Sequence, residues 1–253
     1  MRIQYLVTLL GLWFVLVSNT WAAPLKVLTT GAFKSVLMDM VPAFEARTGH
    51  QVEVKNETAG ALLKMIAAGE TFDLVVLTPG ALKTLAQEGK VDAASVASIA
   101  KVGIGVAVKA GAPKPALSSV DDFKAALLQA QKVAWIDPAS GGSSGIYLEK
   151  LFGQMGLMEM VKPKSVMVFG GLVANKLVTG EADLAIHQIS EILPVQGANL
   201  VGPLPESIQS YTTYGGAWSP SAKNLAGARE FLNMMTSPQA QQVIERKGMQ
   251  KVP

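Results

Sequence analysis

The 253-residue chain contains no cysteine and only two histidines, His50 and His187. The absence of cysteine excludes disulfides, thiolate zinc sites and cysteine nucleophiles. Two histidines are too few for a His-rich metal centre, and the sequence lacks the clustered carboxylates of a calcium or magnesium site. It also lacks internal repeats and low-complexity tracts. We therefore expect a protein that uses neither a metal nor a cofactor.

Basic residues are neither numerous nor clustered. The formal net charge is +3, and it falls to +2 without residues 1–22, in which Arg2 is the single charged residue. The densest basic run is Lys162-Pro163-Lys164, whereas a protein that binds a phosphate backbone shows a clustered basic face. We therefore expect no nucleic-acid partner.

The first 22 residues have the pattern of a secretory signal peptide. Arg2 precedes a mostly apolar run over residues 3–17, and Thr20-Trp21-Ala22 places small residues on both sides of Trp21, as a cleavage site requires. The apolar run is too short for a comfortable membrane span, and no second such segment follows. We expect cleavage near Ala22 and an exported protein large enough to fold without disulfides. An uncleaved N-terminal anchor is the alternative.

Short apolar strands alternate with helical segments in the first part of the mature chain. The pattern predicts strands over residues 25–30, 51–54 and 71–77, followed by helices over residues 35–48, 61–68 and 81–88. Small or hydroxyl residues occupy the three junctions, which are residues 29–32, 58–60 and 78–80. Because the ligand crevice of an open α/β sheet lies at the carboxyl ends of its strands, the junctions should face the same way.

A second set of strands and helices repeats this order. A Gly-containing strand is predicted over residues 102–108, and later strands over residues 133–136, 165–169 and 183–188. The last of these leads into a helix that starts at Ile189. An extended segment over residues 211–218 and two helices, over residues 222–236 and 238–247, complete the chain.

The most distinctive junction is the Gly/Ser loop that follows the apolar strand at residues 133–136. Asp137-Pro138 stops the strand, and a helix opens near Ser144. The first N–H groups of a helix have no partner within it, the helix dipole is positive there, and glycines let the backbone approach a ligand. The hydroxyls of Ser140, Ser143 and Ser144 add further donors. The loop therefore predicts an anion site, with an ordinary serine cap on a surface helix as the alternative.

The same loop matches the nucleophile elbow of α/β-hydrolases, because Gly141-Gly142-Ser143-Ser144-Gly145 fits G-x-S-x-G. An exported serine esterase is therefore the alternative function. Its triad would need Asp183 and His187, which lie in one short predicted strand. An extended chain rises about 3.3 Å per residue, which holds the two about 13 Å apart and too far for a hydrogen bond.

The chain resembles the periplasmic substrate-binding proteins of ABC transporters, and most closely the molybdate-binding group. The resemblance rests on the order and spacing of six segments, which are residues 27–37, 43–52, 63–76, 136–147, 177–186 and 236–241. It implies an α/β protein with the type II periplasmic binding fold, in which two lobes with mixed sheets flanked by helices enclose a cleft. Lobe I would comprise residues 23–105 and 196–253, and lobe II residues 106–195.

The resemblance also implies a role. Such a protein is a periplasmic monomer and not an enzyme, and it captures a small anion in its interlobe cleft and delivers it to a membrane ABC permease. Hinge closure around the ligand gives the form that the permease accepts. A signalling or chaperone role for an exported binding protein stays open beside transport.

The ligand positions depart from those of the molybdate-binding group. Ala32 stands where the group has a hydroxyl residue, Ala59 or Gly60 where it has serine, and Gln188 where it has tyrosine. The Gly/Ser loop is also one residue longer. Because each lost donor to a buried oxyanion costs roughly 1–3 kcal/mol, these changes argue against a molybdate site. We predict an organic carboxylate as ligand, with a tetrahedral oxyanion as the alternative.

The candidate ligand-binding residues stand at the strand–helix junctions. They are Thr30, Gly31, Ala32, Thr58, Ala59, Gly60, Thr78, Ser140, Ser143, Ser144, Gly171, His187 and Gln188. Thr29 and Thr30 alternate faces of a strand, so at most one should point at the cleft. Lys34 is interpreted as solvated, and Trp135 and Trp218 as apolar packing residues. No catalytic residue is assigned.

Overall fold

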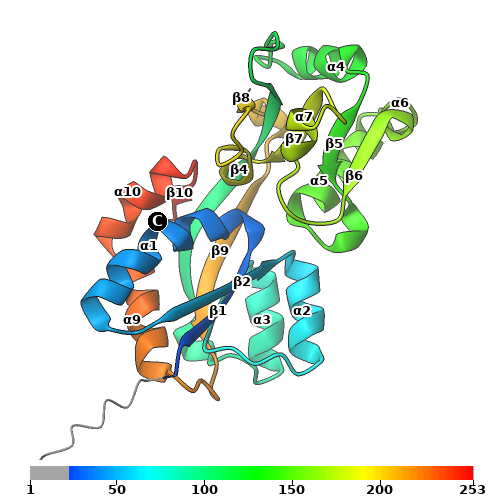
Figure 1. Ribbon diagram of the computed structural model, residues 1–253. Coiled ribbons are helices and arrows are strands. Elements are labelled where there is room, and N and C mark those ends of the chain that lie inside the picture. Colours follow the sequence, from blue (N-terminus) through cyan, green and yellow to red (C-terminus); the bar gives the residue numbers. More distant parts are fainter. Residues whose placement is uncertain (1–22, 253) are drawn as a thin grey trace, which may run out of the picture.

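The computed structural model describes residues 23–252 (Figure 1). The predicted signal peptide, residues 1–22, lies outside them. The helices are α1 Gly31–Thr48, α2 Ala59–Ala67, α3 Pro79–Gln87, α4 Val120–Gln129, α5 Ser143–Gln154, α6 Met158–Val161, α7 Asn175–Val178, α8 Ile189–Ile192, α9 Leu225–Thr236 and α10 Pro238–Arg246. The strands are β1 Leu25–Thr30, β2 Val52–Glu57, β3 Leu74–Leu77, β4 Ala97–Lys109, β5 Val133–Ile136, β6 Ser165–Val168, β7 Leu184–Gln188, β8 Ala198–Pro203, β9 Tyr211–Trp218 and β10 Gln250–Lys251.

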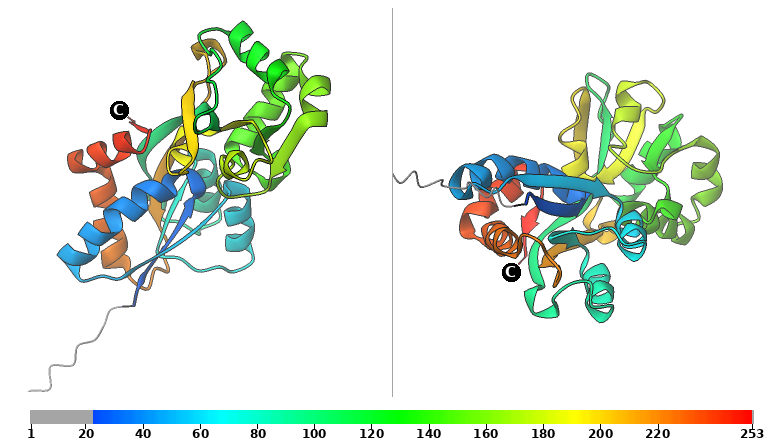
Figure 2. Two further views of the ribbon diagram at one scale, coloured as in Figure 1. Left: turned by 45° about the horizontal axis from the view of Figure 1, so that its top comes forward. Right: turned by 60° about the horizontal axis from the view of Figure 1, so that its bottom comes forward.

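The strands form one mixed sheet in the order β2-β1-β3-β9-β4-β7-β5-β6, and β8 and β10 also pair with β4. β4 is long enough to pair with strands at both ends of this sheet. Residues 97–103 of β4 pair with β9, whereas residues 104–109 pair with β7 and β8. We call β1, β2, β3, β9 and β10 with their helices the first half, and β5 to β8 with theirs the second half. Figure 2 shows the second half at one end of the long β4 and β9 strands.

Helices cover both faces of the first half. On one face Leu25 and Val27 of β1 pack with α1, α9 and α10, where Phe44 and Phe231 lie 4.5 Å apart between ring centroids. On the other face Leu28 of β1 packs with α2 and α3. The alternation along β1 therefore gives this half two separate cores.

The second half is built the same way from different residues. Trp135 of β5 packs edge-on against Phe152 of α5 and is 1% exposed, so its predicted packing role is confirmed. Ala134 and Ile136, on the opposite face of β5, pack with α7 and α8. The predicted α/β architecture of mixed sheets flanked by helices is confirmed, and the two predicted sheets are continuous through β4.

The helices next to the site begin earlier than the sequence pattern predicted. α1 starts at Gly31 and not at Ser35, because Ala32 and Phe33 are buried in the first core. α2 and α3 likewise start two residues before their predicted first residues. The glycines and alanines of the junctions are therefore the first residues of helices, with backbone N–H groups that lack helical partners.

Two further features concern the predicted organisation. β8, at residues 198–203, pairs with residues 105–109 of β4 and so lies in the second half. The predicted lobe boundaries, which place residues 196–253 in lobe I, stay a prediction. Within residues 23–252, no helix is both long enough and apolar enough to cross a membrane.

Candidate functional site

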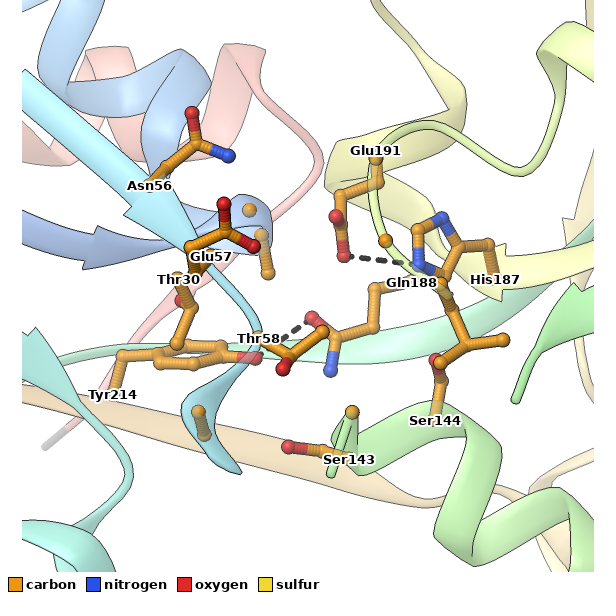
Figure 3. Close-up of a pocket in the computed structure, with 17 residues that line it drawn as sticks. Thr30, Asn56, Glu57, Thr58, Ser143, Ser144, His187, Gln188, Glu191 and Tyr214 are labelled. Atoms are coloured by element: carbon orange, nitrogen blue, oxygen red, sulfur yellow. Dashed lines mark hydrogen bonds and ion pairs between the residues drawn. The ribbon is translucent and has the colours of Figure 1, made fainter. Parts of the chain in front are cut away.

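A cavity of about 280 Å³ lies where the carboxyl ends of strands from both halves meet (Figure 3). Residues from the first half form one wall, and residues from β5, β6 and β7 with the segments that follow them form the other. The lining residues are Thr30, Gly31, Ala32, Asn56, Glu57, Thr58, Ala59, Ile136, Gly142, Ser143, Ser144, Gly170, Gly171, His187, Gln188, Glu191 and Tyr214.

The structure brings ten of the thirteen predicted ligand-binding residues to this cavity. They are Thr30, Gly31, Ala32, Thr58, Ala59, Ser143, Ser144, Gly171, His187 and Gln188. Of the other three, Thr78 is the N-cap residue of α3, away from the lining. Gly60 and Ser140 stand at the rim, where the two halves touch. Thr30 lines the cavity and Thr29 does not, as the alternation of the strand predicted.

Three helices point their N-termini at the cavity. α1, α2 and α5 follow the extended N-cap residues Thr30, Thr58 and Gly142, all of which line it. The hydroxyl of Thr58 accepts a hydrogen bond from the N–H of Ala61, whereas α1 and α5 have no capping side chain. Their first N–H groups and positive dipole ends are free to meet an anion.

The cavity wall carries no lysine or arginine. Its polar groups are mostly neutral, and some lack a partner. Thr30 is 5% exposed, and its Oγ1 makes no hydrogen bond. Nδ1 of His187 is also buried without a partner. Because buried polar groups are nearly always hydrogen-bonded, these two atoms of cavity-lining residues are exceptions.

The two halves touch at the rim of the cavity. Thr58 Oγ1 donates to the carbonyl oxygen of Ser140 at 2.5 Å, and the N–H of Gly60 donates to the carbonyl oxygen of Gly141 at 3.4 Å. A Cβ atom on Gly60 would lie 2.9 Å from the Cα of Gly141. Gly141 also has a φ of 77°, in the left-handed region that favours glycine. At Gly60 and Gly141 the two halves therefore approach more closely than residues with side chains would allow.

His187 and Glu191 form a buried pair on the second-half wall. Nε2 of His187 lies 3.2 Å from Oε2 of Glu191, and their side chains are 2% and 10% exposed. Burial lowers the pKa of His187 from 6.5 to about 3 and raises the pKa of Glu191 from 4.5 to about 8. Both shifts favour neutral groups. At neutral pH the pair is mainly a carboxylic acid that donates to an uncharged imidazole.

Gln188 and Tyr214 join the two halves beside this pair. The phenol of Tyr214, from β9, donates to Oε1 of Gln188 at 2.8 Å, and Nε2 of Gln188 donates to Oγ1 of Thr212 at 3.1 Å. Burial, with a smaller contribution from the nearby Glu191, raises the pKa of Tyr214 far above neutral pH. The amide of Gln188 is therefore largely engaged by β9, and a tyrosine enters the cavity from another strand.

Sequence reasoning missed several residues of the lining. They are Asn56, Glu57, Ile136, Gly142, Gly170, Glu191 and Tyr214. Asn56 and Glu57 could have been found, because they end β2 directly before the predicted junction at Thr58. Glu191 gave no local signal, since an acidic residue in the first turn of a helix is ordinarily solvated. Lys34 is exposed, as predicted.

The esterase alternative fails on geometry. Both carboxylate oxygens of Asp183 accept backbone N–H groups, from Gln131 at 2.8 Å and Lys132 at 2.7 Å. His187 is paired with Glu191 instead. Ser143 and Ser144 are helix N-terminal residues on the cavity wall.

Among residues 23–252, no group of three His, Asp or Glu side chains could hold a metal ion.

Comparison with known proteins places this geometry in a family. The family described as bacterial extracellular solute-binding protein matches residues 25–250. A protein of Pseudomonas sp named aconitate isomerase is 33% identical over 235 residues, which cover 90% of this chain and 88% of that protein.

Solved structures share the fold. The periplasmic molybdate-binding protein of Azotobacter vinelandii superposes with a TM-score of 0.76 at 20% identity, over 90% of this chain and 99% of that one. The sulfate-binding protein SubI of Mycobacterium tuberculosis H37Rv gives 0.72 at 20% identity, over 90% and 87% of the two chains. The chain therefore belongs to the bacterial extracellular solute-binding proteins, with the molybdate-binding-like fold that its sequence indicated.

Proposed function

We propose that this protein captures a small polycarboxylate of the aconitate class in its closed cavity. One observation carries the proposal: three helix N-termini and unpartnered neutral donors line a cavity that has no lysine or arginine. Such a wall attracts an anion through partial positive charges and hydrogen bonds. The relative named aconitate isomerase supports a carboxylate as that anion.

The size of the cavity also favours a ligand larger than a tetrahedral oxyanion. Its volume of about 280 Å³ is roughly nine times the ~30 Å³ that a water molecule occupies in the liquid. A molybdate or sulfate ion would fill only part of this space and leave buried donors unmet. A polycarboxylate can reach donors on both walls at once.

The residues at the positions where the molybdate-binding group has hydroxyls also favour a ligand other than molybdate. Ala32 and Ala59 line the cavity at the starts of α1 and α2, where they supply backbone N–H groups and small side chains. Gln188 uses its amide to hold Tyr214 and Thr212. The wall therefore keeps its backbone donors and lacks hydroxyls at the positions where the molybdate-binding group has them.

Calorimetric titration tests the ligand class. Purified protein would be titrated with cis-aconitate, trans-aconitate, citrate, molybdate, tungstate and sulfate. We expect at least one of the tricarboxylates to bind at least a hundredfold more tightly than the three oxyanions. Submicromolar molybdate binding would contradict the proposal.

We propose isomerisation of the bound ligand as a second function. The sequence predicted a protein that is not an enzyme, and the solved relatives are binding proteins. The observation that favours catalysis is the buried pair of Glu191 and His187. A carboxylate in the site would repel a bound anion, so binding alone gives no reason for a glutamate there. Buried acid–base groups with shifted pKa values are typical of catalytic sites. The name of the curated relative supports the same activity.

Proton NMR of trans-aconitate incubated with the protein tests this second function. We expect the signals of the cis isomer to appear at a rate proportional to protein concentration. If the ligand binds by calorimetry and is recovered unchanged, the protein is a receptor only.

We also propose that the protein acts outside the cytoplasmic membrane as a monomer and passes ligand to an ABC permease. Membership of the solute-binding family supports this partner. Uptake of labelled tricarboxylate by cells with and without the gene tests it, and unchanged uptake would contradict permease delivery while leaving binding intact.

A further inference from the structure

Glu191 occupies a position that anion binding alone does not explain, and the inference drawn from it rests on the proposed isomerisation. Its carboxyl group lies between the ligand cavity and a second cavity of about 350 Å³. The two cavities share Gly31, Asn56, Gly171 and Glu191. Glu191 therefore lines both the ligand cavity and the adjoining second cavity.

The two oxygens of this carboxyl group have different surroundings. Oε2 meets Nε2 of His187 at 3.2 Å. Oε1 lies beside Gly31, where an added Cβ atom would approach to 2.4 Å. Figure 3 shows Glu191 and His187 side by side on the wall opposite Thr30. Contacts on both sides hold the group in one orientation, as a catalytic acid or base requires.

Four titratable side chains line the ligand cavity, and only Glu191 is suited to exchange protons there. Tyr214 keeps its proton and donates a hydrogen bond to Gln188. His187 is a weak base, because burial lowers its pKa to about 3. Glu57 is exposed to solvent. Glu191 is buried, and its pKa of about 8 lies close to the neutral range in which proton transfer in both directions is efficient.

We propose that Glu191 is the catalytic residue that carries a proton between two carbons of an unsaturated tricarboxylate. The Glu191 carboxylate removes a proton from the methylene group next to the double bond. The C–H electron pair becomes the new double bond, and the old π pair takes the proton back from Glu191 at the far carbon. One C–H bond breaks and one forms, so the step needs no oxidant, reductant or cofactor.

His187 is the positioning residue of this pair. Its uncharged imidazole accepts a hydrogen bond from the Glu191 carboxylic acid and, in the other tautomer, donates one to the carboxylate. It can therefore follow both protonation states without acquiring a charge. Nδ1 is buried and has no protein partner, so no protein group fixes which ring nitrogen carries the proton.

The second cavity supplies the remaining charges near Glu191. Lys34 and Asp39 of α1 and Lys247 line it, and Lys247 is paired with Asp39 at 2.8 Å. The buried hydroxyls of Ser35 and Ser190 also lack hydrogen-bond partners. These groups, with His187, Tyr214 and Glu57 on the ligand side, are the polar and titratable neighbours of Glu191, whose pKa is raised by burial.

Glu191→Gln tests the assignment, because glutamine keeps the shape and polarity but cannot exchange the proton. The purified protein would be incubated with trans-aconitate, and the cis isomer followed by NMR. We expect kcat to fall about 10²- to 10⁴-fold, the usual contribution of a positioned acid or base, while the calorimetric Kd changes less than tenfold. Glu53→Gln, an exposed substitution on β2 outside the cavity lining, should keep the wild-type rate.

The outcomes separate the assignment from the function on which it rests. If wild-type protein binds trans-aconitate and does not isomerise it, the proposed isomerisation fails. If wild-type protein isomerises and Glu191→Gln does so equally fast, isomerisation stands and the role of Glu191 is overturned. Loss of the rate in Glu57→Gln, with Glu191→Gln active, would move the role to Glu57. Loss of folding in Glu191→Gln is checked by circular dichroism. Glu191→Asp then serves instead, because it draws the carboxyl group back by one methylene, and an unchanged kcat in that variant would overturn the role of Glu191.

The pH profile tests the role of His187. In wild-type protein kcat/KM should rise with pH and level off above about pH 8, because the base must be unprotonated. His187→Gln keeps a polar partner for Glu191 but cannot change tautomer. We therefore expect the rise of kcat/KM in this variant to occur at a different pH from that of the wild type. An unshifted profile with a normal rate would overturn the positioning role.

Discussion

Two strand–helix junctions meet at the cavity, and they differ in the chemistry that they carry. The junction between β1 and α1 presents Thr30, Gly31 and Ala32 at the start of an 18-residue helix. The junction between β7 and α8 presents His187, Gln188 and Glu191 at a helix of four residues. The first offers neutral donors and a helix dipole, whereas the second offers groups that can exchange protons. Under the proposed function, the same local topology serves binding on one wall and proton transfer on the other.

This division explains how one site can hold an anion next to a glutamate. A carboxylate at the β7–α8 junction would repel a bound anion, but burial keeps Glu191 mainly protonated at neutral pH. The attraction comes from the opposite wall and from α5. In the proposed mechanism binding and proton transfer depend on different residues, so substitutions on the two walls should have separable effects.

The largest effect on affinity should come from the rim, where the two walls are brought together. Gly60→Ala adds a methyl group that would lie 2.9 Å from the Cα of Gly141 in the closed form. Overpacking of this kind costs about 1–3 kcal/mol, so we expect a roughly 5- to 150-fold loss of tricarboxylate affinity by calorimetry. Alanine is also the better helix former, so thermal stability should not fall.

Gly153→Ala is the matched control for the rim. Gly153 lies in α5, and an added Cβ atom there meets no other atom within 4 Å. Its affinity should equal that of the wild type. Unchanged affinity in Gly60→Ala would show that the closed contact between the halves does not contribute to binding.

A loss of affinity of similar size should follow from a substitution in the donor wall itself. Thr30→Val removes the unpartnered Oγ1 and keeps the branched shape that suits a strand. A hydrogen bond to a charged group contributes about 1.5–3 kcal/mol, so we expect a loss of tenfold or more in tricarboxylate affinity. The rate of isomerisation at saturating ligand should stay near that of the wild type, because proton transfer lies on the other wall.

Thr29→Val provides the comparison for Thr30. Thr29 is fully buried, and its hydroxyl donates to the carbonyl oxygen of Thr30 at 3.3 Å, away from the cavity lining. It should leave affinity nearly unchanged. Equal losses in the two variants would indicate a general disturbance of β1 and not a lost ligand contact.

The sequence predicted the donor wall better than the acid–base wall for a physical reason. Thr30, Gly31, Ala32 and Ser143 stand at junctions that hydrophobic periodicity and glycine reveal locally. Their function follows from being at a helix start, which the chain pattern shows. The fold was predictable on the same basis, apart from short elements such as β8 and β10, which depend on pairing with β4.

Glu191 and Tyr214 could not be predicted in this way. Each owes its role to burial against a segment distant in sequence. Glu191 meets α1 at Gly31, and Tyr214 reaches Gln188 across the sheet. The sequence identified the junctions that contain Gly60 and Ser140 but not their contacts at the rim. Gly60 donates to Gly141 and Ser140 accepts from Thr58, and both hydrogen bonds depend on the approach of the two halves.

The smallest expected effect is on stability, and it isolates the acid–base wall without any ligand. The raised pKa of Glu191 gives stability that is complete below about pH 4.5 and is lost as the pH rises through about 8. The lowered pKa of His187 gives stability that is complete above about pH 6.5 and is lost as the pH falls through about 3. Together these shifts favour greatest stability between about pH 4.5 and 6.5.

Glu191→Gln should remove the alkaline part of this dependence, because glutamine does not ionise. We expect the difference in Tm between Glu191→Gln and wild-type protein to move in favour of the variant by a few degrees between pH 6 and pH 9. Glu53→Gln, whose carboxyl group is exposed, should show no such trend. A constant difference across this range would mean that Glu191 is not held protonated, and the wall opposite Thr30 would then carry a fixed negative charge that a bound polycarboxylate could not tolerate.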